Sequence, residues 1–425
     1  MKKLSLLFVL FLFGCQPLVH KLETITKAQD STPSEPYQPH QQFESRDLIV
    51  QKSTVKKIPV ALFLPLSGKQ KDLGLSLANA AMLSLFENDL NHNIELVLID
   101  SKDTADEAKQ AFQEIVNRKI KIVVGPVFSS SVEVIEKDAR QNQITVISLS
   151  NNKQLMGKIN NEGGVFLAGM MPEAQIDKIV TYAIEKGKYS FAIIAPNSQY
   201  GNTVTTQFKK IVKNRDGNFI TAEFYKPNDA DLDRVVNRVI TSFSISSRLK
   251  AKKDAVINES DRSYPQIIMI PESGKILSKI VASIKKQNVD ERDFQIVGTS
   301  QWDDISTLND YNLTGAWFAS PENEKFRNFE KTYYQTYNKF PPRISSITYD
   351  SIAAISTLID YKKGQLPTIQ DFTSYSIAPK NGFNGIDGLF RYIPNGLVQR
   401  NLAVLRVSSG RFETIEKPVD QFLKY

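Results

Sequence analysis

The chain has 425 residues, 41% of them hydrophobic and 23% charged, so it is long enough to form two domains with cores of their own. Its net charge of +7 fits an anionic neighbourhood such as a membrane surface or a cell-wall polymer, although a plainly solvated basic surface is the simpler interpretation. No stripe of Lys and Arg interleaved with aromatic residues points to nucleic acid. Of three histidines, only His92 lies outside the N-terminal tail, and we predict it to be a surface loop residue. A Cys/His metal site or a Ser-His-Asp triad would depend on it alone, so we expect no catalytic residue, metal or cofactor.

The first residues have the pattern of an export signal. Met1-Lys2-Lys3 precedes a short apolar run from Leu4 to Phe13, which predicts a signal peptide over residues 1–14 rather than a spanning helix. The run closes in Leu12-Phe13-Gly14-Cys15, which resembles the lipobox of bacterial lipoproteins and implies lipidation of Cys15 and stable anchoring in a membrane. An ordinary signal peptide with an incidental cysteine is the alternative. The next residue is Gln16 rather than the Asp that retains such proteins in the inner membrane, which favours the outer membrane.

Residues 15–57 are rich in Gln, Pro, Ser, Thr and charge. They offer too little apolar surface to offset the entropy cost of ordering, so we predict a disordered tether. About 40 residues would reach roughly 130 Å when fully extended.

From Ile58 onward, apolar runs of strand length alternate with helical patterns. The first run ends in the turn Pro65-Leu66-Ser67-Gly68, and further runs cover 94–99, 120–124 and 144–149. Thr104-Ala105-Asp106-Glu107 has the form of a capping box, and the serines 129–131 could cap the helix that follows them. The alternation predicts parallel βαβ units, in which ligands bind at the carboxyl ends of the strands.

The same theme restarts after Pro172. We predict a second α/β lobe with strands at 191–195, 219–225, 267–270 and 294–297, and a helical extension with an insertion between 242 and 263. A strand at 313–318, helices at 326–337 and 345–359, and a Gly-punctuated ribbon over 382–412 complete the chain.

Three turns together resemble those of type I periplasmic binding proteins, the family of the leucine/isoleucine/valine-binding proteins. They are Pro65-Leu66-Ser67-Gly68, Gly125-Pro126 and Tyr200-Gly201. The resemblance implies an α/β clamshell of two discontinuous lobes, each with a mainly parallel sheet flanked by helices. It implies that the chain crosses between the lobes three times, and we place these crossings near Pro172, Asp303 and Phe372. Lobe 1 is then 58–172 plus 304–372, and lobe 2 is 173–303 plus 373–425.

Several segments of the last third resemble the penicillin-binding-protein activator lipoproteins. These segments are Gly298–Asp304, Gly315–Pro321, Pro341–Asp350, Gly382–Tyr392 and Arg400–Leu405. The resemblance implies docking onto a penicillin-binding protein, a bifunctional peptidoglycan synthase, with no chemistry of the chain's own. The best-studied branch carries a large helical-repeat domain before the clamshell, whereas only the short tether occupies that place here.

A small amino-acid-like ligand would need hydroxyl and backbone donors for its carboxylate and an acid for its ammonium group. Candidates lie at predicted strand ends of both lobes: Ser67, Ser129, Ser148, Ser150, Tyr200 and Glu272. Glu272 resembles the ammonium-binding acid of branched-chain amino-acid receptors. The alternatives are helix caps for the serines and a first-turn acid that complements a helix dipole for Glu272. Asp303-Asp304 could form an acid pair for glycoside chemistry, but adjacent acids diverge, so we expect a structural or hinge role.

Two hypotheses follow. The first is a non-enzymatic lipoprotein that regulates cell-wall synthesis through a protein partner and needs an exposed docking surface. The alternative is a receptor that delivers an amino acid to an ABC transporter, which predicts that Ser148, Ser150 and Glu272 converge in a cleft. A peptidoglycan hydrolase is disfavoured, because no acid/base constellation is present.

Overall fold

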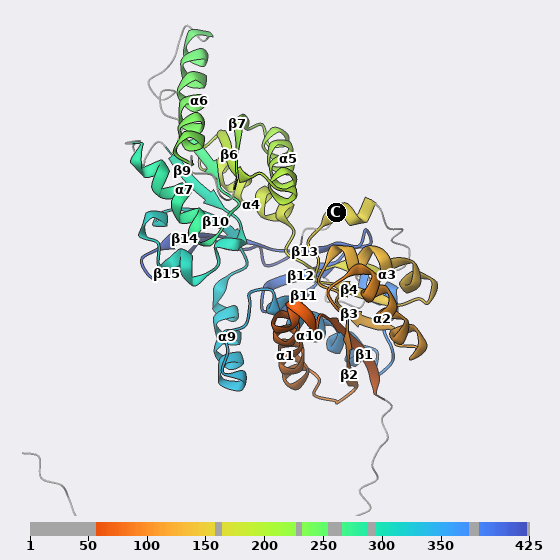
Figure 1. Ribbon diagram of the computed structural model, residues 1–425. Helices are drawn as coiled ribbons and strands as arrows, with labels where there is room; N and C mark the ends of the chain where they lie inside the picture. The colour runs from red at the N-terminus through yellow and green to blue at the C-terminus, as the bar shows by residue number, and fades with distance from the viewer. Residues whose placement is uncertain are drawn as a thin grey trace, which may run out of the picture. The chain divides into compact units, whose positions relative to one another are not determined.

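The structure is a computed structural model that describes residues 57–157, 164–226, 232–253, 266–287, 294–373 and 382–422 (Figure 1). The predicted signal peptide, the tether up to residue 56, Cys15 and the insertion from 254 onward lie outside these ranges. Residues Val55–Tyr425 belong to one compact unit. Within the described ranges, none of the helices combines the length and the apolar character that a bilayer span requires.

The first sheet has five parallel strands in the order β2-β1-β3-β4-β5. They are Ile94–Asp100, Ile58–Leu64, Ile122–Val124, Thr145–Ser148 and Val165–Leu167. Residues Val60–Leu64 of β1 are fully buried, because helices cover both faces of the sheet. Helices α1 (Lys71–Asn88) and α10 (Ser345–Tyr361) pack on one face, and α2 (Ala105–Asn117) and α3 (Ser129–Gln141) pack on the other (Figure 1). The predicted βαβ organisation is confirmed.

The caps of α2 and α3 were both predicted from the sequence, and only the cap of α2 is confirmed. The capping box of α2 is confirmed, since Glu107 N–H donates to Thr104 Oγ1 at 3.3 Å and Thr104 N–H donates to Glu107 Oε2 at 3.2 Å. The expected serine cap of α3 is wrong. Phe128 takes the N-cap position without a side-chain bond, which places Ser129 inside the first turn and leaves its hydroxyl for another partner.

The second sheet has seven strands in the order β15-β14-β10-β9-β8-β6-β7. Five of them are parallel: β6 (Ser190–Pro196), β7 (Asn218–Tyr225), β8 (Gln266–Met269), β9 (Phe294–Gly298) and β10 (Trp317–Ser320). The antiparallel strands β14 (Ala403–Ser408) and β15 (Arg411–Glu416) extend one edge. Helices α4 (Pro172–Glu185) and α5 (Gln199–Asn214) cover one face, and α6 (Leu232–Lys253) and α7 (Gly274–Lys286) cover the other.

A small antiparallel sheet completes the first core. Its strands β11 (Phe383–Gly385), β12 (Gly388–Tyr392) and β13 (Val398–Arg400) contribute apolar side chains to the cluster beneath α10 and α11 (Ile369–Thr373). Shorter helical segments occur at Gly68–Gln70, Lys153–Gly157, Ser300–Trp302, Ile305–Leu308 (α8) and Tyr311–Leu313, and α9 spans Asn323–Tyr337.

The sheets divide the chain differently from the predicted lobe boundaries. The predicted lobe 1 includes residues 304–372, but β10 in this range pairs with β9 and β14 of the seven-stranded sheet. The predicted lobe 2 includes residues 373–425, but β11–β13 pack in the core of the five-stranded sheet. The strand expected at 313–318 begins only at Trp317, because Tyr311–Leu313 forms a helical turn and Gly315 adopts φ +90° before the strand.

Candidate functional site

The turn after β1 is held by the end of β2. Asp100 Oδ1 accepts hydrogen bonds from the N–H groups of Leu66 and Lys102, each at 2.9 Å. Lys102 Nζ lies 2.7 Å from Asp100 Oδ2 and 3.3 Å from Ser67 Oγ. Burial alone would raise the pKa of Asp100, but the hydrogen bonds from Lys102, Ser67 and Leu66 hold it well below its usual range. The contacts of Ser67 therefore stabilise the turn itself.

Three of the predicted serines meet at the carboxyl ends of β3 and β4. Ser148 is fully buried; its Oγ donates to Pro126 O at 2.8 Å and accepts from Ser150 N–H at 3.1 Å. The hydroxyls of Ser129 and Ser150 are 2.8 Å apart, which joins the start of α3 to the loop after β4. Ser148 thus joins the loop after β4 to Pro126, and the contact between Ser129 and Ser150 joins the same loop to the start of α3.

The predicted residues of the second sheet form a separate group. The Glu272 carboxylate accepts from the hydroxyl of Tyr225 and from Ser273 N–H at 3.0 Å. Its backbone carbonyl accepts from the indole Nε1 of Trp302 at 2.9 Å. Burial, with the negative charge of Glu272 nearby, raises the pKa of Tyr200 to about 12, so both tyrosines stay protonated at neutral pH. Helix α7 begins at Gly274, so Glu272 lies before its first turn and is held by tyrosine and backbone donors.

A cavity of about 440 Å³ lies between elements of the two sheets. Ser129 and Ser150 line it, whereas Ser67, Ser148, Tyr200 and Glu272 are not among its lining residues. The lining is mainly apolar, and its two charged groups are Arg343 and Asp387. The other lining residues are Val127, Phe128, Leu149, Asn151, Met170, Ser300, Gln301, Pro321, Ile344 and Ile347.

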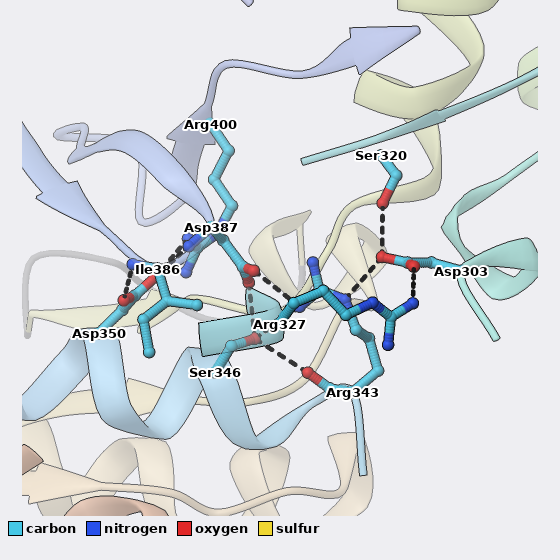
Figure 2. A network of polar contacts seen from close by, with 9 residues as sticks. All are labelled: Asp303, Ser320, Arg327, Arg343, Ser346, Asp350, Ile386, Asp387 and Arg400. Carbon is cyan, nitrogen blue, oxygen red and sulfur yellow. Dashed lines mark hydrogen bonds and ion pairs between the residues drawn. The ribbon is translucent and has the colours of Figure 1, made fainter. Parts of the chain in front are cut away.

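Arg343 is the centre of a buried ionic network at this cavity (Figure 2). Its Nε donates to Asp303 Oδ2 at 2.9 Å, and its Nη1 donates to Asp387 Oδ1 at 2.7 Å and to Ser346 Oγ at 2.8 Å. Both carboxylate side chains are fully buried. Burial disfavours the guanidinium charge, but the two carboxylates more than compensate and raise the pKa of Arg343. Because Asp303 follows β9 while Asp387 lies between β11 and β12, Arg343 ties the two sheets together.

The network continues through the middle of α10. Asp350 Oδ1 accepts from Ile386 N–H at 2.6 Å, and its Oδ2 lies 3.3 Å from Arg400 Nη1 (Figure 2). Gly385 permits this approach, because a Cβ there would lie 2.4 Å from Asp350 Cγ. Burial, followed by the charge of Asp387, raises the pKa of Asp350 to about 6. Asp350 therefore fixes the β11–β12 turn, and with it the position of Asp387.

The acids of the Trp302-Asp303-Asp304 motif diverge as predicted. Asp303 faces Arg343, whereas Asp304 caps α8 by accepting from Ser306 N–H at 2.8 Å. Within the described ranges, no three potential metal ligands lie together. The chemistry that the site offers is hydrogen bonding and ion pairing.

The network as a whole was not predicted from the sequence. Ser346 and Asp350 are four residues apart in α10, and this spacing puts both polar groups on one buried face of the helix. That spacing was the available signal for a buried partner.

Comparison with known proteins shows that residues 57–411, most of the chain, match the family described as periplasmic binding protein. An uncharacterized protein of Rickettsia prowazekii is 22% identical over 87% of this chain and 91% of its own length. A protein of Vibrio antiquarius named penicillin-binding protein activator LpoA is 23% identical over 91% of this chain. The chain spans 62% of the length of that Vibrio protein.

Solved structures give the same fold. An ABC transporter substrate-binding protein of Sphaerobacter thermophilus matches with a TM-score of 0.66 at 14% identity, covering 86% of this chain and 99% of the other. A branched chain amino acid ABC transporter periplasmic ligand-binding protein of Burkholderia xenovorans matches with a TM-score of 0.63 at 14% identity, covering 84% and 94%. At this identity the likeness concerns the fold alone.

Proposed function

Because the chain belongs to the periplasmic binding protein family, we propose that it acts by binding and not by catalysis. It is a periplasmic lipoprotein that regulates peptidoglycan synthesis by docking on a cell-wall synthase. The observation that carries this proposal is the similarity to the Vibrio antiquarius activator, which covers 91% of this chain and 62% of that protein.

The geometry around Glu272 supports the regulator over an amino-acid receptor. A receptor needs an unengaged acid in the cleft for the ligand's ammonium group. Glu272 already accepts hydrogen bonds from Tyr225 and Ser273, and the one carboxylate that lines the cavity, Asp387, is paired with Arg343. An ammonium group in this cavity would therefore lose its hydration without gaining a free counter-charge.

The solute receptor remains the second candidate, because of the cavity itself. Its volume of about 440 Å³ lies within the range of small-molecule sites, roughly 300–1,000 Å³. Ser129, Ser150 and the first turn of α3 offer donors for a ligand carboxylate. Ser67, Ser148, Tyr200 and Glu272 would then act from behind the lining residues.

One pair of experiments separates the candidates. The full chain is immobilised and exposed to purified bifunctional penicillin-binding synthases of the same organism, and glycan polymerisation is followed with and without it. A regulator retains one synthase and raises its rate. In parallel, the refolded chain is heated with amino acids. A ligand at a thousand times its Kd adds about 4 kcal/mol to the folded state, so a clear midpoint shift without synthase binding makes the chain a receptor.

Anchoring and lobe boundaries are part of the proposal. Lipidation of Cys15 would tether the protein to a membrane, with the outer membrane favoured by Gln16; labelling with a radioactive fatty acid, lost in Cys15→Ser, tests it. We place the lobe crossings near Pro172, after β10 and after β13, since sheet membership changes there. If the chain crosses between the lobes at these three points, proteolytic cleavage at all three should yield two lobes, each made of two chain segments.

A further inference from the structure

A second and larger cavity, here called the α4–α5 groove, shares one residue, Arg400, with the network described above. Its volume is about 1250 Å³, and it is lined by helices α4 and α5 and by the β12–β13 hairpin. Sites for small molecules have about 300–1,000 Å³. The groove therefore exceeds the size that a single metabolite would fill, and it suits an extended chain.

Helix α5 presents a polar stripe to the groove. Gln207, Lys210 and Asn214 line it at spacings of three and four residues, which puts them on one face of the helix. The two amide side chains each carry a donor and an acceptor, the complement of a peptide group. Among the described residues, neither amide has a hydrogen-bond partner, so both are available to a bound chain.

The charges of the groove are predominantly positive. Six basic and three acidic residues line it. Three of the basic residues are neutralised by neighbours: Arg215 by Asp177 at 2.9 Å, Lys178 by Glu416 at 2.5 Å and Arg400 by Asp350 at 3.3 Å. Lys153 and Lys210 are exposed and have no ion-pair partner in the part of the chain that the structure describes. These two ammonium groups therefore remain for an anionic partner.

We propose that the α4–α5 groove binds an extended acidic peptide segment of a protein partner. Carboxylates of the segment pair with Lys153 and Lys210, while its backbone N–H and C=O groups meet the amides of Gln207 and Asn214. A segment in this groove contacts α4 and α5 of one lobe and the β12–β13 hairpin of the other. The inference holds whether or not the partner is a cell-wall synthase.

Fluorescence anisotropy with two labelled probes, a hexaglutamate and a hexalysine peptide, tests the inference on the purified chain. Hexaglutamate should bind and hexalysine should not. The double variant Lys153→Glu, Lys210→Glu should weaken hexaglutamate binding at least about tenfold, since opposed charges become like charges.

The control is Lys331→Glu, Lys339→Glu, which changes the net charge equally at exposed lysines that do not line the groove. It should leave hexaglutamate binding within about twofold, because salt screens exposed charges that do not contact the bound peptide. Equal weakening in both double variants, or no preference for hexaglutamate over hexalysine, would overturn the inference.

Discussion

Replacing Arg343 by methionine tests whether the buried network holds the two lobes together. The substitution keeps an unbranched apolar stem against Phe326, whose ring centroid lies 4.1 Å from the guanidinium carbon. It leaves the fully buried carboxylates of Asp303 and Asp387 without their main counter-charge. Breaking a buried ion pair costs about 3–5 kcal/mol. Because 23% of the Arg343 side chain is exposed, water screens part of the interaction, and we expect a loss of about 3 kcal/mol in the free energy of unfolding.

Urea unfolding at pH 7, followed by the fluorescence of Trp302 and Trp317, measures this loss. The matched control is Arg327→Met, since Arg327 is 39% exposed and lies 3.8 Å from the same Asp303. A pair this exposed is worth less than about 1 kcal/mol. Unpaired buried carboxylates have raised pKa values, so the deficit of Arg343→Met should shrink when the pH falls from about 7 to about 5. If Arg343→Met lowers the free energy of unfolding no more than Arg327→Met does, or if the deficit is independent of pH, the network does not stabilise the contact between the lobes as proposed.

Three further predictions concern single residues, all measured by urea unfolding. The pKa of Asp350 is raised from 3.8 to about 6, so its contribution to stability is present at low pH and is lost as the pH rises through 6. Asp350→Asn should flatten the dependence of the unfolding free energy on pH in this range, and an unchanged slope would contradict the prediction. Gly74→Ala places a Cβ 1.9 Å from Pro65 O and should destabilise by at least about 2 kcal/mol despite better helix propensity, whereas a stabilised variant would show that the turn can move. Ser148→Ala leaves Ser150 N–H without its side-chain acceptor and should cost about 1–3 kcal/mol; no loss would mean that water replaces the hydroxyl.

Much of the fold was predictable because its signals are local. The apolar run from Ile58 has both faces covered, and the capping box at Thr104 forms as predicted. His92 lies exposed in a turn with φ +52°, also as predicted. The type I periplasmic binding protein fold is confirmed by the family match and by the solved structures.

Features that depend on distant partners were not predictable. Met82 continues the apolar stripe of α1, yet it is 40% exposed. The sequence does not reveal this exposure, because the stretch 73–86 contains no charged residue that would mark the outer face of the helix. Strand β10 could pair in either sheet on the basis of its composition, and its neighbours β9 and β14 decide the assignment.

The candidate site was predictable only in part. Ser129 and Ser150 meet as their positions at strand ends suggest. Glu272 has the expected motif, but its partner Tyr225 lies 47 residues away. The links from Arg343 to Asp303 and Asp387 span 40 and 44 residues, so no local pattern could reveal them.

Both lobes are completed only near the end of the chain. The core beside α10 needs Phe383, Phe390 and Tyr392, and the core beneath the seven-stranded sheet needs Leu405 and Val407. A nascent polypeptide, which emerges with its N-terminus first, therefore lacks part of each core until its last residues appear, which delays folding until synthesis is nearly finished. A premature stop codon or C-terminal clipping before β11 removes strands from both lobes at once. In such products neither lobe has a complete core, so both lobes should be more sensitive to proteolysis.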